Sequence, residues 1–498
     1  MSRLLDRRQQ YVSLRRGVAL LLPVLALIFA LTLYPFAFSD SLPPQPALTL
    51  ITGLSHVFDM LQNVLLFTPL GIALHWLLAG MGAGRRGQMV GALLVAGGLA
   101  LAIEVAQLFI PGRTAALVDV LANAGGAALG SGRLAQPVAP VVDRMAGWCL
   151  AVVRQTPAAL AGVGLIGWLL VAGGLLAYWQ QATLPSNWSE RYALQIGAAS
   201  DGRRFWPGYA GFVALYDHAF TAAKARATLT PAAALAAQPL FAYDLTQFPP
   251  ALDGPFAHSL AAQGKPAFTA EGVGVGYQRW LASSEPLAGV AAAVAQARAF
   301  TLVAQLAPRE PERVAEGLMV NVGREIDSHN ISLIQSGRDL LVRIRLPLTR
   351  PLNDRPALRF TEVFRDAKPR VVAFSYDGVT ARLFVDGQPH RQTYTFGPGE
   401  VAVNRWLPVQ AHQIGGWTVA LAATLSAPLA LVGAPWRGRR WWLFLLALAG
   451  PLIIGYAPWL VIPQPLSGAM ALAAALTLLC GILLMVWFTR PFRSRSVA

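Results

Sequence analysis

The stretch QMVGALLVAGGLALAIEVAQLFI, residues 88–110, decides the fold class, because Glu104 is its only charged residue. A transmembrane helix needs about 20 mostly apolar residues. Similar blocks recur at 17–38, 54–79, 114–131, 157–179, 414–434, 441–462 and 466–489. The sequence therefore predicts a polytopic α-helical membrane protein with about eight transmembrane helices.

Two of these blocks have alternative interpretations. Residues 17–38 resemble a signal peptide, but they are long, lack a small-residue cleavage site and lead into Pro43 and Pro44, which favours a retained helix. Residues 114–131 are short and contain Asp119 and Asn123. A buried amphipathic or re-entrant helix therefore remains an alternative to a full crossing there.

The composition excludes an ordinary soluble enzyme. Only 13% of the 498 residues are charged, about half the share typical of soluble chains. The net charge of +15 suggests nucleic acid, but most of the excess flanks the apolar blocks, so we expect a lipid bilayer and no nucleic acid as partner. The two cysteines, Cys149 and Cys480, give no disulfide framework.

The basic residues also predict the topology. They gather in alternate connections and at both termini: Arg3, Arg7, Arg8, Arg15, Arg16, Arg85, Arg86, Arg133, Arg144, Arg154, Arg437, Arg439, Arg440, Arg490, Arg493 and Arg495. By the positive-inside rule this side is cytoplasmic. We expect a multi-pass protein of the bacterial plasma (inner) membrane with both termini in the cytoplasm.

Residues 180–413 contain no apolar block long enough to cross and connect two outer helix ends, so we expect them outside the cytoplasm. In DLLVRIRLPL, residues 339–348, Leu340, Val342, Ile344 and Leu346 face one way while Arg343 and Arg345 face the other, as in a half-buried strand. Repeated strands of this kind predict an all-β sandwich. The alanine-rich stretch 219–239 is expected to be helix or loop.

The predicted organisation follows from these boundaries. It comprises a basic N-terminus (1–16), a four-helix membrane domain (17–133), a cytoplasmic linker (134–156), a fifth membrane helix (157–179), the sandwich (180–413), three C-terminal membrane helices (414–489) and a basic tail (490–498).

The first four helices differ from the others because they carry polar residues within apolar stretches. These residues are His56, Asp59, Asn63, Glu104, Gln107, Asp119 and Asn123, with Arg113 in the turn between the third and fourth helices. A charged side chain in hydrocarbon costs at least about 2.5–3.5 kcal/mol. We therefore expect these side chains to converge on an outward-facing polar pocket, although interhelical hydrogen bonding alone is the alternative for each. Gly125, Gly126 and Gly130 are expected to be close-packing positions.

Three motifs in this region carry a family resemblance: Asn63–Gly71 (NVLLFTPLG), Glu104–Arg113 (EVAQLFIPGR) and Asp119–Gly126 (DVLANAGG). In order and spacing they resemble the VanZ-like membrane family over residues 20–133. The resemblance implies a link to glycopeptide (teicoplanin-type) resistance and marks the quoted polar residues as functional positions. It brings no settled reaction.

The predicted sandwich resembles laminin-G/concanavalin-like jelly rolls, from Phe300-Thr-Leu to Asp386-Gly387. The segment Leu194–Asp217 resembles strands that follow this core in such domains but precedes it here, which is the order of a circularly permuted version. Such folds often bind glycans, and Trp206, Tyr209, Tyr243 and Trp280 are available for stacking on sugars, with core packing as the alternative for each. They sometimes hold calcium, but no calcium-loop spacing is present, so no cofactor or metal is predicted.

Two classes of function remain. In the first, the sandwich binds a surface glycan or protein and the helices anchor or relay that event. In the second, an enzyme or transporter acts on a lipid-linked (polyprenyl-phosphate) envelope intermediate in the polar pocket, with Arg113 holding phosphate and Glu104 or Asp119 moving a proton. The absence of a recognisable catalytic motif favours the first class, so the protein is more simply not an enzyme.

Overall fold

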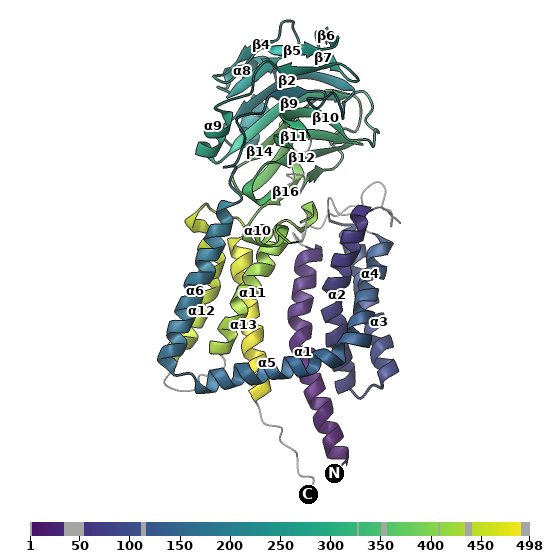
Figure 1. The fold of residues 1–498 in the computed structure, drawn as a ribbon, viewed down its shortest axis with the longest axis vertical. Coiled ribbons are helices and arrows are strands. Elements are labelled where there is room, and N and C mark those ends of the chain that lie inside the picture. Colours follow the sequence, from purple (N-terminus) through teal and green to yellow (C-terminus); the bar gives the residue numbers. More distant parts are fainter. Residues whose placement is uncertain are drawn as a thin grey trace. The chain divides into compact units, whose positions relative to one another are not determined.

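The computed structural model describes residues 2–33, 54–110, 116–325, 328–349, 356–406, 409–433 and 441–489. They divide into two compact units (Figure 1). The helical unit contains Met1–Leu176, Gly416–Ala457 and Leu466–Ala498, and the β-rich unit contains Ala177–Gly415 and Pro458–Pro465.

The helical unit is built from long apolar helices. They are α1 (Ser2–Leu33), α2 (Leu54–Gly80), α3 (Arg85–Gln107), α4 (Leu117–Leu129), α5 (Ala135–Gln155), α6 (Ala158–Gln181), α11 (Gly416–Gly433), α12 (Trp441–Tyr456) and α13 (Ser467–Thr489). One turn of π-helix, η1 (Gly130–Leu134), joins α4 to α5, and a 3-10 turn, η4 (Ala457–Leu460), follows α12.

Four helices in the described part of the chain are long and apolar enough to cross a membrane: Gln9–Leu33, Met60–Gly80, Arg85–Gln107 and Ala158–Gln181. The segments Gly416–Ala430, Leu445–Leu460 and Ser467–Leu483 are apolar but shorter. A membrane protein is thereby confirmed, whereas the expected eight crossings are met by length at only these four positions. The other crossings remain a prediction.

The structure gives the helical extent of two predicted segments. Within the block 114–131, the α-helix α4 has only 13 residues, about 20 Å at 1.5 Å per residue, which is shorter than the hydrocarbon core of about 30 Å. The expected linker 134–156 is largely the helix α5. One of its prolines, Pro140, lies inside this helix.

The first four helices pack through small residues. A Cβ added at Gly126 would lie 2.3 Å from the carbonyl oxygen of Val64, and one added at Gly130 would lie 2.1 Å from that of Thr68. Both glycines therefore let α4 and η1 approach the backbone of α2, as the sequence predicted. Gly125 faces open space, so the prediction was wrong for that residue.

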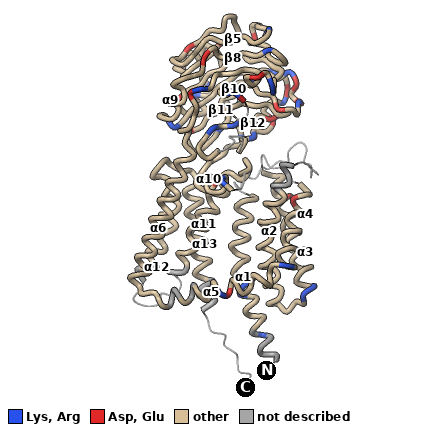
Figure 2. Tube along the Cα trace, in the orientation of Figure 1, with Lys and Arg blue, Asp and Glu red and all other residues tan. Residues whose placement is uncertain are grey.

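The helices α6, α11, α12 and α13 share a second apolar core. Its buried members include Leu169, Leu176, Leu429, Ile454 and Met470. Charge is distributed unevenly along the helical unit, because its exposed arginines lie at the end where α2 meets α3 and where α5 runs (Figure 2).

The strands of the β-rich unit form two antiparallel sheets. They are β1 (Leu194–Ile196), β2 (Gly208–Tyr216), β3 (Phe241–Asp244), β4 (Ala251–Asp253), β5 (Leu260–Gln263), β6 (Ala267–Thr269), β7 (Gly272–Val275), β8 (Trp280–Ser283), β9 (Phe300–Pro308), β10 (Gly317–Glu325), β11 (Ser328–Ser336), β12 (Asp339–Ile344), β13 (Leu358–Phe360), β14 (Arg370–Tyr376), β15 (Thr380–Val385) and β16 (Gln388–Thr395). The 7-stranded sheet has the order β13-β12-β11-β10-β1-β8-β5. The 9-stranded sheet has the order β16-β15-β14-β9-β2-β3-β4, with β7 paired to β2 and β6 to β7.

The two sheets make the expected sandwich. Leu340, Val342 and Ile344 of β12 are buried, as their alternation predicts. The rings of Phe360, in the smaller sheet, and Phe374, in the larger, meet 6.2 Å apart between the sheets. The jelly-roll connections and the permuted order remain predictions, although β1 and β2 do lie inside the two sheets beside β10 and β9.

Short helices cover part of the outer face of the larger sheet. The helices α7 (Ala222–Ala227) and α8 (Pro231–Ala236) come from the alanine-rich stretch. They pack on Phe212, Tyr216 and Ala373. The remaining helices of this unit are α9 (Val290–Ala297) and α10 (Pro398–Asn404), with 3-10 turns η2 (Pro347–Thr349) and η3 (Ala411–Gln413).

Candidate functional site

Glu104 lies in the last turn of α3 and is only 3% exposed. Its Oε2 accepts a hydrogen bond of 2.8 Å from the backbone N–H of Ala116, the N-cap residue of α4. The first amides of a helix lack partners within the helix and carry positive potential, so a carboxylate stabilises that end. Glu104 therefore fixes where α4 begins relative to α3.

Gln107 is 6% exposed and ties α3 to α1. Its Nε2 donates to the carbonyl oxygen of Thr32 at 3.0 Å, and the Thr32 hydroxyl donates to Ile28 O at 2.7 Å. This is a helix-to-helix hydrogen bond of the kind weighed as the packing alternative.

Asn123 is a buried polar residue of the helical unit whose side-chain oxygen is not explained by hydrogen bonding between helices. It is 2% exposed, and its Oδ1 accepts no hydrogen bond from the residues that the structure describes. It lies one turn before Gly126, which abuts Val64, so its backbone is level with the turn of α2 that precedes Val64. A buried acceptor without a donor costs about 1–3 kcal/mol, so this oxygen is the natural position for a ligand or water.

The other predicted pocket residues are less completely placed. Asn63 and Asp119 are partly buried on α2 and α4. His56 and Asp59 belong to helix α2, but their side chains are not among those that the structure describes. Arg113 also lies outside the described residues. The convergence of all these side chains on one pocket therefore stays a prediction.

Sequence analysis missed a second polar cluster, at the opposite end of α2. His75 and Ser131 are both buried, and their Nδ1 and Oγ lie 3.4 Å apart. The Ser131 hydroxyl also lies 3.5 Å from the carbonyl oxygen of Gln88. The available signal was position: His75 follows Gly71 by one turn and so shares the face that packs on α4.

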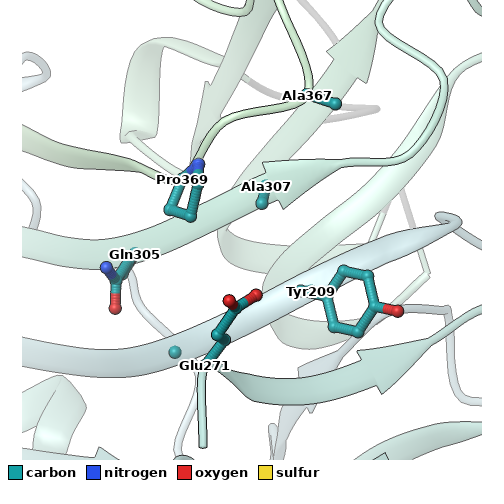
Figure 3. A pocket seen from close by; sticks show the side chains of 7 residues that line it. Tyr209, Glu271, Gln305, Ala307, Ala367 and Pro369 are labelled. Atoms are coloured by element: carbon teal, nitrogen blue, oxygen red, sulfur yellow. The ribbon is translucent and has the colours of Figure 1, made fainter. Parts of the chain in front are cut away.

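In the sandwich, a groove opens on the part of the larger sheet that α7 and α8 leave uncovered. It has a volume of about 120 Å³ and is lined by Tyr209, Gly211, Glu271, Gln305, Ala307, Ala367 and Pro369 (Figure 3). β2 supplies Tyr209, β9 supplies Gln305, and the turn between β6 and β7 supplies Glu271. Three polar side chains of different chemistry therefore face one hollow.

The geometry of this groove is held by specific contacts. Arg309 donates from Nη2 to the Tyr209 hydroxyl at 2.8 Å, and its guanidinium lies 4.9 Å from the ring centroid. A Cβ at Gly211 would lie 2.1 Å from Oε1 of Gln305, so glycine there lets the amide lie across the neighbouring strand. Tyr209 is thus held by Arg309 and Gln305 has room beside Gly211, while Glu271 is exposed.

Two of the four predicted stacking residues are core residues instead. Trp206 is fully buried and donates from Nε1 to Gln335 at 2.6 Å. Tyr243 is 1% exposed and donates to the carbonyl oxygen of His258, and burial raises its pKa to about 12. Neither ring has a face free for a sugar.

Of the other two, Trp280 is partly buried with its ring against Gly202, and Tyr209 lines the groove. In the described part of the chain no group of three or more His, Cys, Asp or Glu side chains is arranged to hold a metal.

Comparison with known proteins matches one region of the chain. Residues 8–135 match the model of the VanZ/LLP1 family, the region that contains the three quoted motifs. No curated protein and no solved structure matches the chain. Residues 8–135 are therefore a VanZ-like domain, and the protein is a membrane protein that joins this domain to a β-sandwich.

Proposed function

We propose that the chain is a cell-envelope protein whose sandwich binds a surface glycan in the Tyr209 groove while its helices anchor the sandwich to the membrane. The observation that carries this proposal is the groove itself. It lies on an uncovered sheet face and brings together a phenol, an amide and a carboxylate. Planar amide and carboxylate groups can each bond neighbouring hydroxyls of a sugar.

The size of the groove indicates the kind of ligand. A volume of about 120 Å³ is well below the roughly 300–1,000 Å³ of pockets that enclose a small molecule. A site of this size fits one unit of a longer polymer, with the rest of the chain lying along the sheet. A polysaccharide or peptidoglycan strand is therefore favoured over a free monosaccharide.

The test is a glycan-binding survey with the full-length protein in nanodiscs. Tyr209→Ala is expected to weaken binding about ten-fold or more, since loss of about 1.4 kcal/mol is a factor of ten. Tyr277→Ala is the matched control, because Tyr277 is 66% exposed on the same domain and does not line the groove.

Each outcome of the glycan-binding survey either supports or refutes the groove as a glycan-binding site. Binding that is lost in Tyr209→Ala and kept in Tyr277→Ala supports the groove. Equal binding by wild type and Tyr209→Ala refutes the groove as the site, and absence of glycan binding by the wild type refutes glycan recognition altogether.

A second function is favoured by the unpaired oxygen of Asn123. In this alternative the VanZ-like domain acts on a lipid-linked (polyprenyl-phosphate) intermediate, with Arg113 binding the phosphate. Asn123→Leu would then abolish activity on that lipid while the glycan survey stayed unchanged. If the variant retains the envelope phenotype of the wild type, this alternative fails.

The proposed location follows the charge pattern. The arginine-bearing end of the helical unit is assigned to the cytoplasm of the bacterial inner membrane, with both termini there. This topology places the sandwich outside the cytoplasm, where an envelope glycan is accessible. The VanZ-like domain further supports a link to glycopeptide resistance.

A further inference from the structure

The helix α5 presents an apolar stripe that no part of the described helical unit covers. Val141, Met145 and Trp148 are 47%, 62% and 69% exposed. They are spaced i, i+4, i+7, so they lie on one side of the helix. This stripe adjoins the face that packs on the bundle, where Ala135, Val138 and Val142 meet α2.

The orientation of α5 differs from that of its neighbours. It runs across the end of the helical unit where α2 meets α3, whereas α1, α2 and α3 run along the unit (Figure 1). Trp76 of α2 donates from Nε1 to the carbonyl oxygen of Ala135 at 3.0 Å. Arg16 of α1 forms a bidentate ion pair with Asp143 of α5. Helix α5 is thus fastened to two helices that have spanning length.

These attachments set the depth of α5. Trp76 lies four residues before the end of α2 at Gly80, about 6 Å at 1.5 Å per residue. Arg16 directly precedes the apolar block 17–38 of α1. Helix α5 is therefore attached to α1 and α2 at the ends of their apolar stretches, the level at which amphipathic helices bury their apolar face about 5–10 Å into the headgroup boundary.

The charges beside the stripe indicate which lipid it meets. Arg133 and Arg144 are exposed at this end of the unit, and Asp143 is paired with Arg16. Among the described side chains near α5, the charge left after the Arg16–Asp143 pair is positive, and tryptophan favours the headgroup level. A basic amphipathic helix of this kind is complementary to anionic phospholipid.

We propose that α5 is an in-plane membrane-surface helix that inserts Val141, Met145 and Trp148 into the headgroup–acyl boundary and binds anionic phospholipid headgroups through Arg144 and Arg133. The proposal is independent of the glycan function, because it concerns the other unit of the protein.

Spin-label accessibility in nanodiscs tests the insertion. In the full chain with Cys149→Ser and Cys480→Ser, single labels are placed at Val141→Cys, Met145→Cys and Trp148→Cys, with Gln136→Cys on the exposed polar side as control. The expected result is preferential collision of the three stripe labels with oxygen, and of the control label with a water-soluble nickel chelate. Stripe labels as accessible to nickel as the control overturn insertion, and labels protected from both reagents identify a protein partner instead.

Lipid selectivity tests the headgroup. Association of spin-labelled phosphatidylglycerol is compared with that of spin-labelled phosphatidylcholine. The wild type is expected to prefer phosphatidylglycerol, and Arg144→Gln to reduce this preference about five-fold, the factor that matches about 1 kcal/mol for one basic residue. Arg203→Gln, 86% exposed as a side chain on the sandwich, is the control and should change nothing. Equal preference in wild type and Arg144→Gln overturns the anionic-lipid site.

Discussion

At the residue scale, Gly125 and Gly126 of α4 provide a matched pair of alanine substitutions that tests how α4 packs on α2. Gly126→Ala is expected to destabilise the helical unit by about 1–3 kcal/mol, the usual cost of overpacking, because its Cβ would lie 2.3 Å from Val64 O. Gly125→Ala meets open space and should be neutral or stabilising, since alanine is the better helix former. Unfolding in a graded detergent series measures both, and equal losses would contradict the packing described.

His390 gives the sandwich a pH dependence. Its Nε2 bonds Thr361 O at 3.1 Å and its Nδ1 accepts from the N–H of Gln392 at 3.2 Å, which together fit the neutral ring. Burial lowers the pKa of His390 below 6.5. A base with a lowered pKa takes up its proton more readily when unfolded, so its contribution to stability is present above about pH 6.5 and is lost as the pH falls.

The thermal midpoint of the β-sheet signal should therefore fall between about pH 7 and about pH 5. His390→Gln should flatten this dependence, because glutamine does not titrate. An unchanged pH profile in the variant would assign the dependence to other groups.

At the scale of elements, Glu104 links the end of α3 to the start of α4. Glu104→Leu removes the acceptor for the Ala116 N–H and should cost about 1–3 kcal/mol. Glu104→Gln keeps an acceptor oxygen and should cost less. Thermal unfolding of both variants in detergent measures the difference, and a glutamine variant as unstable as the leucine variant would show that the negative charge itself is required.

The sequence predicted a helix or strand correctly where the apolar residues form one continuous block or follow one clear alternation. The prediction failed where the hydrophobic pattern is mixed. The alternation in 339–348 identified β12, and the apolar block 88–110 identified most of α3. Residues 134–156, which contain α5, were predicted only as a cytoplasmic linker between the fourth and fifth membrane helices. Only the structure shows that one side of α5 packs on Trp76 while another is exposed.

The residues of the Tyr209 groove could likewise be predicted from the sequence only in part. Tyr209 could be chosen from the sequence as an aromatic residue, but Trp206 and Tyr243 were equally eligible. Pairing of β2 with β9 brings Tyr209 opposite Ala307, and nothing local in either segment specifies that register. Gln305 and Glu271 join the site only through this tertiary arrangement, whereas Glu104 and Asn123 were found because polar residues are rare in apolar helices.

At the scale of the whole molecule, the two proposed functions belong to different units and can be tested separately. The sandwich contains the groove, and the VanZ-like domain contains the buried Glu104 and Asn123. Deletion of residues 185–412 is expected to abolish the envelope phenotype, while Glu104→Gln, Arg113→Gln and Asp119→Asn that still insert should leave most of it. The minimum inhibitory concentration of a glycopeptide measures this in cells, and tolerance of the deletion with loss in the point variants would shift the function to the helices.

The most direct measurement is the affinity of the full-length protein for a purified envelope glycan, compared between wild type and the double variant Tyr209→Ala/Gln305→Ala. If the sheet hollow is where the polymer docks, the double variant loses detectable binding and keeps the thermal midpoint of the wild type. An affinity equal to that of the wild type in a correctly folded double variant would contradict the account.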